Sequence, residues 1–313
     1  MAHYDIEADW QLLNTCNYRC TYCFFGPETL GSKLTSYADA DAWRASFDRT
    51  GMTWLLHLTG GEPGIYPKFV ELCSSLTRRH FISLNTNLTH SSFSQFARCI
   101  DPSRVSFINA GLHLEERDKR GDNARFIDHA TLLQDSGFRL LISLVATPDA
   151  LRRFEEAAER LRSANLFPIP KLFRGTSDGK IYPEAYSESE RALFRDYAKR
   201  ARDFYHDRTN KGSEPPSIDM LNDDRYVGGV PIYKGRLCSA GSRFVQIYPN
   251  GDVFRCGGLG LQGNLLAGTA VFRSKAALCD NQHCYYFCDK YSTIQKANVS
   301  PAARLMRYSG RAH

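Results

Sequence analysis

The feature that most restricts the fold of this chain is a regular alternation of strand-like and helix-like segments between residues 10 and 174. The segments that favour strands are Trp10–Thr15, Thr53–Thr59, Ile82–Leu88, Arg104–Ala110, Arg139–Ala146 and Phe167–Phe173. The segments that favour helices are Asp39–Asp48, Pro67–Arg79, Ser91–Cys99, Asn123–Asp135 and Asp149–Ala164. Such alternation predicts a parallel sheet with right-handed crossovers. Six units predict an α/β fold, a partial (βα)6 TIM-like barrel that binds ligands at the carboxyl ends of its strands.

The chain changes character after the barrel. A charged helix is expected at Glu188–Asp207, and two short β segments flank Asn250-Gly251, which is a strong hairpin signal. We therefore expect a barrel with its covering helix at 1–208, a linker at 209–235, a small hairpin-and-helix domain at 236–293 and a basic tail at 294–313.

Net charge and its distribution restrict the classes of partner that this chain can bind. The 313 residues carry a net charge of +6, and no acid follows Asp289. The cations after that point are Lys290, Lys296, Arg304, Arg307 and Arg311. The remaining chain is close to neutral, whereas a nucleic-acid binder usually shows a basic face through its fold, so we expect no nucleic-acid partner. The tail is either solvated or a flap over an anionic substrate.

Nothing in the sequence suggests a membrane protein. No apolar run approaches the roughly 18 residues of a membrane span. Acids occupy the region where a secretory signal needs bases, so we expect a cytoplasmic protein without membrane partners.

Eight of the ten cysteines fall into two groups. The first group is Cys16, Cys20 and Cys23, and the second is Cys238, Cys256, Cys279, Cys284 and Cys288. In a reducing compartment, clustered cysteines bind metal more often than they form disulfides. The other two, Cys73 and Cys99, lie on predicted helices, and we expect both to be buried in the core.

The first group directly follows the first predicted strand. Three thiolates can bind three irons of a [4Fe–4S] cluster, which leaves one iron open for chemistry, as in a catalytic zinc site with three protein ligands. Structural zinc is the alternative, but it needs a fourth ligand, and the first downstream histidine, His57, lies on the next strand.

Three motifs at the ends of successive strands resemble those of the radical S-adenosylmethionine (SAM) superfamily. The run CNYRCTYCF, from Cys16 to Phe24, resembles its cluster-binding signature. Thr59-Gly60-Gly61-Glu62-Pro63 is similar to its GGEP motif, and Thr86-Asn87 is similar to its TNG motif with Leu88 in place of glycine. The resemblance spans residues 10–174 in the family's order.

This resemblance implies a chemistry and a set of SAM contacts. A reduced [4Fe–4S] cluster would cleave SAM to a 5′-deoxyadenosyl radical, which removes a hydrogen atom from the substrate. By analogy, the Tyr22 backbone faces the adenine, and Gly60 and Gly61 admit the methionyl ammonium beside Glu62. Further contacts are assigned from their positions at strand ends to Asn85, Thr86, Ser143 and Val145. The alternative reading makes these four ordinary turn or core residues.

The second cysteine group is similar to the SPASM/twitch extension of radical SAM enzymes. Its first half has the spacing Cys238-x12-Gly251-x4-Cys256, and its second half departs from the full seven-cysteine pattern. Five cysteines suffice for one auxiliary [4Fe–4S] cluster. Cys238 and Cys256 would be ligands, and two of Cys279, Cys284 and Cys288 would complete the set. A zinc ribbon is the alternative.

Substrate contacts are expected near the mouth of the barrel. His113 follows the fourth strand, and a charged loop runs from Glu115 to Arg120. Lys171 and Arg174 end the sixth strand and could hold a phosphate or carboxylate, or merely keep the rim soluble.

Three classes of function remain. The first is an enzyme that oxidises or rearranges a polar small molecule in a biosynthetic pathway, with electron loss through the auxiliary cluster. The second is a maturase that forms crosslinks, thioethers or epimers on a precursor peptide. Both need an electron donor such as flavodoxin or ferredoxin. The third, a non-enzymatic iron–sulfur scaffold, leaves the Gly60-Gly61-Glu62-Pro63 motif unexplained.

Overall fold

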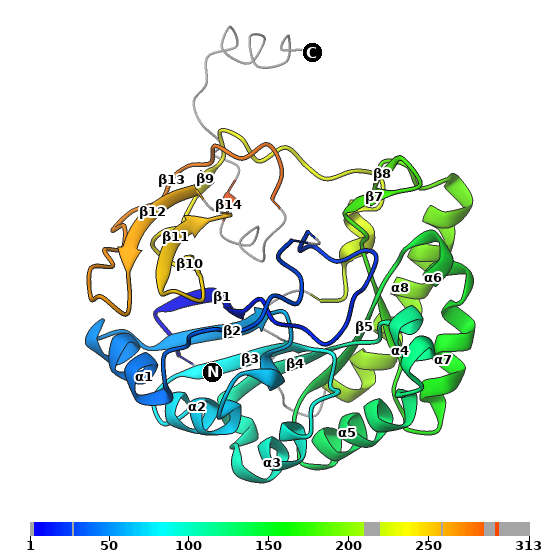
Figure 1. Cartoon of the computed structure of the whole chain (residues 1–313). Helices are drawn as coiled ribbons and strands as arrows, with labels where there is room; N and C mark the ends of the chain where they lie inside the picture. Colours follow the sequence, from blue (N-terminus) through cyan, green and yellow to red (C-terminus); the bar gives the residue numbers. More distant parts are fainter. Residues whose placement is uncertain (1–2, 27, 210–219, 258, 285–291, 294–313) are drawn as a thin grey trace, which may run out of the picture.

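The structure, a computed structural model, describes residues 3–26, 28–209, 220–257, 259–284 and 292–293. A curved sheet forms its centre, with strands in the order β12-β11-β10-β1-β2-β3-β4-β5-β6 (Figure 1). The barrel strands are β1 (Ile6–Leu13), β2 (Trp54–Gly60), β3 (Phe81–Thr86), β4 (Val105–Gly111), β5 (Leu140–Val145) and β6 (Pro168–Lys171). Successive members of this set pair in parallel, which confirms the predicted α/β partial barrel.

Helices cover the outer face of this sheet (Figure 1). The α-helices are α1 (Ala40–Arg49), α2 (Phe69–Leu76), α3 (Ser92–Cys99), α4 (Leu114–Arg120), α5 (Asn123–Asp135), α6 (Pro148–Arg152), α7 (Phe154–Arg162) and α8 (Glu188–Thr209). Short 3-10 helices are η1 (Pro63–Ile65), η2 (Pro102–Arg104) and η3 (Asp223–Tyr226). The predicted helix Asp149–Ala164 is divided into α6 and α7. The predicted charged loop at 115–120 is wrong, because these residues form α4.

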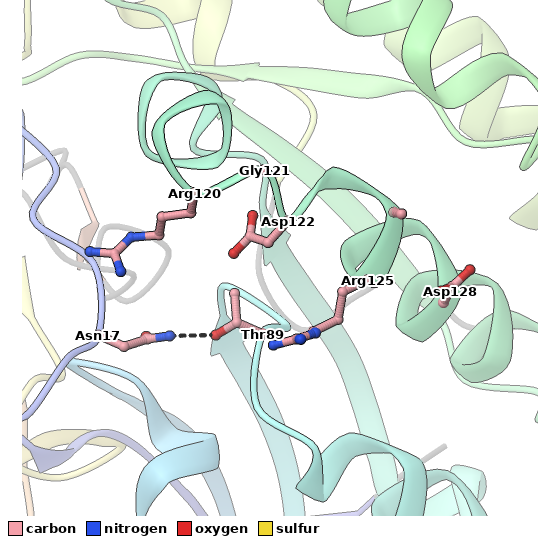
Figure 2. A pocket seen from close by; sticks show the side chains of 8 residues that line it. Asn17, Thr89, Arg120, Gly121, Asp122, Arg125 and Asp128 are labelled. Carbon is pink, nitrogen blue, oxygen red and sulfur yellow. Dashed lines mark hydrogen bonds between the residues drawn. The ribbon is translucent and has the colours of Figure 1, made fainter.

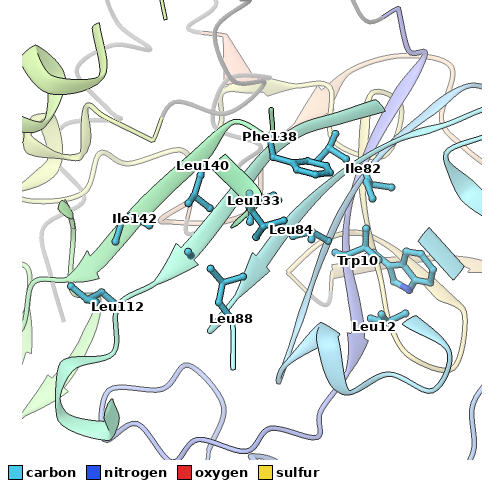
Figure 3. Close-up of a cluster of buried hydrophobic side chains, with 14 of the residues drawn as sticks. Trp10, Leu12, Ile82, Leu84, Leu88, Leu112, Leu133, Phe138, Leu140 and Ile142 are labelled. Carbon is cyan, nitrogen blue, oxygen red and sulfur yellow. The ribbon is translucent and has the colours of Figure 1, made fainter. Parts of the chain in front are cut away.

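Aromatic side chains fill the layer between sheet and helices. Trp10 of β1 packs on Trp43 of α1 with ring centroids 4.6 Å apart, and Phe47 and Trp54 extend the cluster. Figure 3 shows the continuation of this core from Trp10 along the strands to Ile142. Burial of each such side chain contributes about 1.5–3 kcal/mol to folding, so this layer holds the helices onto the sheet.

The two isolated cysteines differ in environment. Cys73 is buried on α2, as predicted. Cys99 is exposed at the end of α3, so the prediction that it is a core residue is wrong. Phe93 and Phe96 fill the buried face of that helix, and Cys99 falls outside it.

Polar side chains line the opposite face of the sheet, inside the barrel. Toward the amino ends of the strands the lumen is closed by buried residues. There, His57 bonds Ser83 (Nδ1–Oγ 2.6 Å) and Glu7 (Nε2–Oε2 3.3 Å). Toward the carboxyl ends, Asn85 and Asn109 face the same lumen and are only half-buried. The lumen is therefore accessible from the carboxyl ends.

The C-terminal strands continue the barrel sheet. β10 (Phe244–Ile247) pairs in parallel with β1, and β11 (Asp252–Cys256) and β12 (Leu259–Asn264) follow in antiparallel order. The turn at Gly251, with φ +88°, forms the predicted hairpin. A small sheet contains β13 (Ala277–Leu278), β9 (Leu237–Cys238) and β14 (Ser292–Thr293), and a separate hairpin contains β7 (Gly175–Ser177) and β8 (Lys180–Tyr182).

Some predictions cannot be compared with the structure. The basic tail at 294–313 and residues 210–219 of the predicted linker lie outside the described residues. Within the described part of the chain, no helix combines the length and the apolar character that crossing a bilayer requires.

Candidate functional site

The first cysteine group lies in the loop that leaves the carboxyl end of β1, which we call the cluster loop (residues 14–24). Cys16, Cys20 and Cys23 are half-buried and close enough for each thiol to influence another. Burial raises the pKa of Cys16 to about 11 and that of Cys20 to about 12. Binding of iron would displace these protons, because the thiolate is the ligand.

The arrangement of thiols suits a cluster better than a single ion. Among the described residues, no three His, Cys, Asp or Glu side chains converge as one bound ion would require. A [4Fe–4S] cluster binds each thiolate to a different iron, so its ligands need only surround a common volume. The three thiols of the cluster loop lie near one another, so each could bind a separate iron.

Two glycines bring the end of β2 against the start of the cluster loop. The Gly61 amide donates to the Leu13 carbonyl at 2.8 Å. A Cβ on Gly60 would lie 2.2 Å from the Leu13 oxygen, and one on Gly61 would lie 2.1 Å from the Thr15 oxygen. Gly60 also has a φ of +127°, which favours glycine. The motif is thus required by local packing, in addition to the expected approach of SAM.

Glu62 joins the second and third motifs. Its buried carboxylate accepts hydrogen bonds from the Thr86 hydroxyl (2.7 Å), the Asn87 amide (2.7 Å) and the Gly64 amide (2.9 Å). Burial raises the pKa of this carboxyl, and the three donors oppose that rise. The Thr86 hydroxyl is therefore engaged by the protein, which favours the turn-residue reading for Thr86.

Leu88 occupies the position of the glycine in the family's TNG motif. Its φ is +55°, in the left-handed region that glycine adopts most easily. The side chain is fully buried, and the Leu88 carbonyl is 2.7 Å from Nδ1 of His129 on α5. The chain keeps the backbone conformation of a glycine while filling the core with leucine.

Helix α4 holds the cluster loop, and sequence reasoning missed it. Arg117 is fully buried and donates to the carbonyls of Asn87 (2.5 Å) and Gly111 (3.0 Å) and to the Tyr18 hydroxyl (3.0 Å). The Arg19 amide donates to Glu116 of the same helix at 3.0 Å. The sequence contained one signal for this helix, because Gly121 follows Arg120 and glycine often ends a helix. In the structure Gly121 caps α4 with a φ of +64°.

His113 lies at the inner end of α4, beside the cluster loop. Its Nδ1 is 2.8 Å from the Tyr22 hydroxyl and 3.5 Å from the Cys20 sulfur. Burial lowers the pKa of His113 to about 3, and the Arg117 guanidinium acts in the same direction. The structure therefore places His113 beside the cluster loop as a neutral, half-buried imidazole.

The remaining strand-end candidates lie at the lumen. Asn85 accepts a hydrogen bond from Asn109 at 2.8 Å, Ser143 is buried on β5, and Val145 is half-buried at the end of that strand. Lys171 ends β6 in an ion pair with Asp223 at 2.9 Å.

Arg174 connects to the second cysteine region. Its guanidinium is 3.5 Å from the Cys284 carbonyl and 5.8 Å from the ring centre of Tyr226. Protein groups thus contact both predicted anion-binding cations, Lys171 and Arg174.

Four cysteines of the second group gather around one volume. Cys238 and Cys256 are buried in a small apolar cluster, and Cys279 and Cys284 pack against it. None of the four forms a disulfide with another described residue. Burial raises the pKa of Cys256 to about 11, and the Arg255 guanidinium opposes that rise. The fifth candidate, Cys288, lies outside the described residues.

A surface pocket of 510 Å³ adjoins the cluster loop (Figure 2). Asn17 of the loop donates to the Thr89 hydroxyl at 2.7 Å, and Arg120 and Asp122 contribute from the α4–α5 turn. A neighbouring hollow of 470 Å³ shares Asn17 and Thr89 and also contacts His90 and His129. None of the lumen residues described above lines either hollow.

Comparison with known proteins agrees with this geometry. Residues 10–161 match the model of the radical SAM superfamily, and no curated protein matches the chain. Native anSMEcpe with bound AdoMet is 17% identical, with a TM-score of 0.55 over 84% of this chain and 79% of that one. SuiB of Streptococcus suis is 16% identical, with a TM-score of 0.55 over 84% and 64%. SuiB bound to precursor peptide SuiA is also 16% identical, with a TM-score of 0.52 over 81% and 60%.

At these identities the structural likeness establishes the fold alone. The family match adds the identity of the barrel, and it covers all three motifs that resemble those of the superfamily. Residues 10–161 of this chain therefore form a radical SAM superfamily domain.

Proposed function

We propose that this protein cleaves SAM at a [4Fe–4S] cluster held by Cys16, Cys20 and Cys23, and that the radical so formed leads to net oxidation of a polar small molecule. The observation that carries the proposal is the contact between the Gly60-Gly61 end of β2 and the backbone of Leu13 and Thr15, directly before Cys16, within the region that matches the radical SAM model.

The chain would bind and orient both cofactors. When bound, the cluster and SAM supply a 5′-deoxyadenosyl radical that removes a hydrogen atom from the substrate. We assign the Tyr22 backbone to the adenine and Asn85, Ser143 and Val145 to the remaining contacts at the lumen. Thr86 acts indirectly, because its hydroxyl orients Glu62.

The gathered thiols of Cys238, Cys256, Cys279 and Cys284 support one fully ligated auxiliary [4Fe–4S] cluster. Such a cluster supplies a site that can accept one electron. In the net reaction the substrate then loses a hydrogen atom, an electron and a proton, and one SAM is consumed for each product. Cys288 is left without a role in this set. A flavodoxin or ferredoxin would supply the electron that cleaves SAM.

A second candidate function is peptide maturation. The observation in its favour is that similar solved structures include anSMEcpe with bound Cp18Cys peptide and SuiB with precursor peptide SuiA. Anaerobic incubation with SAM, reductant and either candidate metabolites or candidate peptides, followed by mass spectrometry, separates the two functions by showing which class changes mass.

The proposal is tested first on SAM itself. Anaerobically reconstituted protein should release 5′-deoxyadenosine under strong reductant, and Cys16→Ala, Cys20→Ala and Cys23→Ala should each abolish this release because each removes an iron ligand. Cys99→Ala, an exposed cysteine outside both groups, is the matched control and should remain active. Retention of cleavage in any of the three variants would contradict the assignment.

Net oxidation is tested in heavy water. An oxidised product lacks two hydrogens and carries no solvent deuterium at carbon. A product with the composition of the substrate and one deuterium at carbon would instead show that a thiol donates hydrogen, and it would overturn the oxidation. Cys238→Ala and Cys256→Ala should lose product while they still cleave some SAM.

A further inference from the structure

Arg255 is a buried cation in the middle of the auxiliary cysteine region. It lies on β11, directly before Cys256, and its residue exposure is only 6%. Arginine is rarely buried to this extent unless its donors are satisfied. The reason for its burial therefore has to be found among its neighbours.

The guanidinium binds backbone carbonyls next to other cysteines. Its Nε donates to the Ala240 carbonyl at 3.3 Å, two residues after Cys238. Its Nη2 donates to the carbonyls of Ala277 (3.2 Å) and Leu278 (2.8 Å), directly before Cys279. One planar fork thus joins the segments that carry three of the four gathered thiols, a geometry that arginine provides and lysine does not.

The positive charge of Arg255 is poorly neutralised. Its acidic partner is Asp280, 3.4 Å from Nη1, and the Asp280 side chain is 78% exposed. A carboxylate in water screens a neighbouring cation weakly, and such pairs contribute little. The three carbonyls accept from Nε and Nη2 without cancelling the charge, so a net cation remains beside the thiols.

We propose that Arg255 is a positioning residue that holds three auxiliary ligand segments together and raises the reduction potential of the auxiliary cluster. The proposal rests on the auxiliary cluster put forward above. Reduction adds one negative charge to a thiolate-bound cluster, and a fixed cation in a poorly solvated site stabilises the reduced form more than the oxidised form.

This role would favour electron transfer from the substrate radical to the auxiliary cluster. Oxidation of that radical would release one electron to the cluster and one proton to solvent, and a low-potential iron–sulfur or flavin protein would later accept the electron. A higher potential makes the first transfer more favourable. Arg255 would thus have two effects: it holds the ligand segments together, and its charge favours net oxidation of the substrate.

The test uses the full chain in a Cys16/Cys20/Cys23→Ala background, in which only the auxiliary cluster remains. Arg255→Gln removes the charge, Arg255→Lys keeps the charge without the fork, and Arg243→Gln removes an exposed cation just before β10 as the matched control. Iron content is measured together with the midpoint potential by EPR-monitored redox titration. We expect Arg255→Gln to lower the potential, and Arg255→Lys and Arg243→Gln to leave it close to that of the parent.

The outcomes separate the two proposals. A parent that binds no iron refutes the auxiliary cluster and the role of Arg255 with it. A parent and an Arg255→Gln variant with equal iron and equal potentials overturn the role of Arg255 and leave the cluster intact. If Arg255→Gln loses its iron, Arg255→Lys decides: iron at the parent's potential supports the charge, and a lowered potential contradicts it.

Discussion

Asp9, on β1, is a carboxyl group whose ionised form is disfavoured by burial. It faces the lumen beside Gln246 of β10, and more than nine-tenths of it is buried. Burial raises its pKa to about 7, and a hydrogen bond with Gln246 opposes that rise. Its Oδ1 has no hydrogen-bond partner among the described residues. The folded protein therefore binds a proton here that the unfolded chain releases near pH 4.

The first prediction concerns Asp9→Asn. Because the folded pKa lies above the unfolded one, the wild type loses stability as pH rises from about 4 to about 7, by up to about 4 kcal/mol. Asparagine has the same shape without the charge, so the variant should equal the wild type near pH 4 and be more stable at pH 8. Urea unfolding at both pH values measures the difference.

Asp128→Asn, which changes an exposed side chain on α5, is the control for Asp9→Asn. An Asp9→Asn variant that is less stable than the wild type at pH 8 would show that the ionised carboxylate is required for folding.

At the scale of elements, the barrel strands were predictable and the parts around them were less so. Local periodicity identifies β1 to β6, because each strand is a continuous apolar or alternating run. Local periodicity failed to predict α4, because six of the seven residues of this helix are charged. The burial of α4 depends instead on contacts between Arg117 and residues distant in the sequence. The cysteine spacing located the cluster loop but could not reveal that Arg117 and Glu116 hold it.

The second prediction concerns α4. Arg117→Met removes the donors to Asn87 and Gly111 and leaves those buried carbonyls without their partner, so the free energy of unfolding should fall by about 3 kcal/mol. The cluster loop loses its contact through Tyr18, so the iron bound on reconstitution should fall as well. Urea unfolding and iron analysis measure the two effects.

Arg125→Met, on the exposed face of α5, is the control for Arg117→Met and should change neither quantity. If Arg117→Met unfolds like the wild type, α4 does not hold the loop in the way the hydrogen bonds indicate.

At the scale of the whole molecule, the C-terminal hairpin and the barrel share one sheet. β10 pairs with β1 from Glu7–Phe244 to Trp10–Ile247, and Val245 and Ile247 are buried in the main core. Sequence patterns predicted the hairpin but not this pairing, because nothing local indicates which strand a hairpin will join. The segments 1–208 and 236–293, predicted as separate domains, therefore both contribute strands to one continuous sheet.

The third prediction follows from that continuity. With both clusters absent, thermal or urea unfolding of the full chain should show a single transition when tryptophan fluorescence and far-UV circular dichroism are compared, because the shared core couples the parts. Two separated transitions would mean that the hairpin region folds on its own.

A chain that stops at residue 235 should be less soluble than the full chain, because it exposes the unpaired edge of β1.

The pairing of β1 with β10 also affects how the protein is made. β1 is synthesised roughly 230 residues before its partner strand β10. At ribosomal rates of about 5–20 residues per second, the β1 edge stays open for on the order of 10 to 50 seconds. During that time a strand rich in buried apolar side chains, including Ile6, Ala8 and Trp10, lacks a neighbour on one side. Chaperone binding during translation should therefore concentrate on the N-terminal strand and end once residue 247 has left the ribosome.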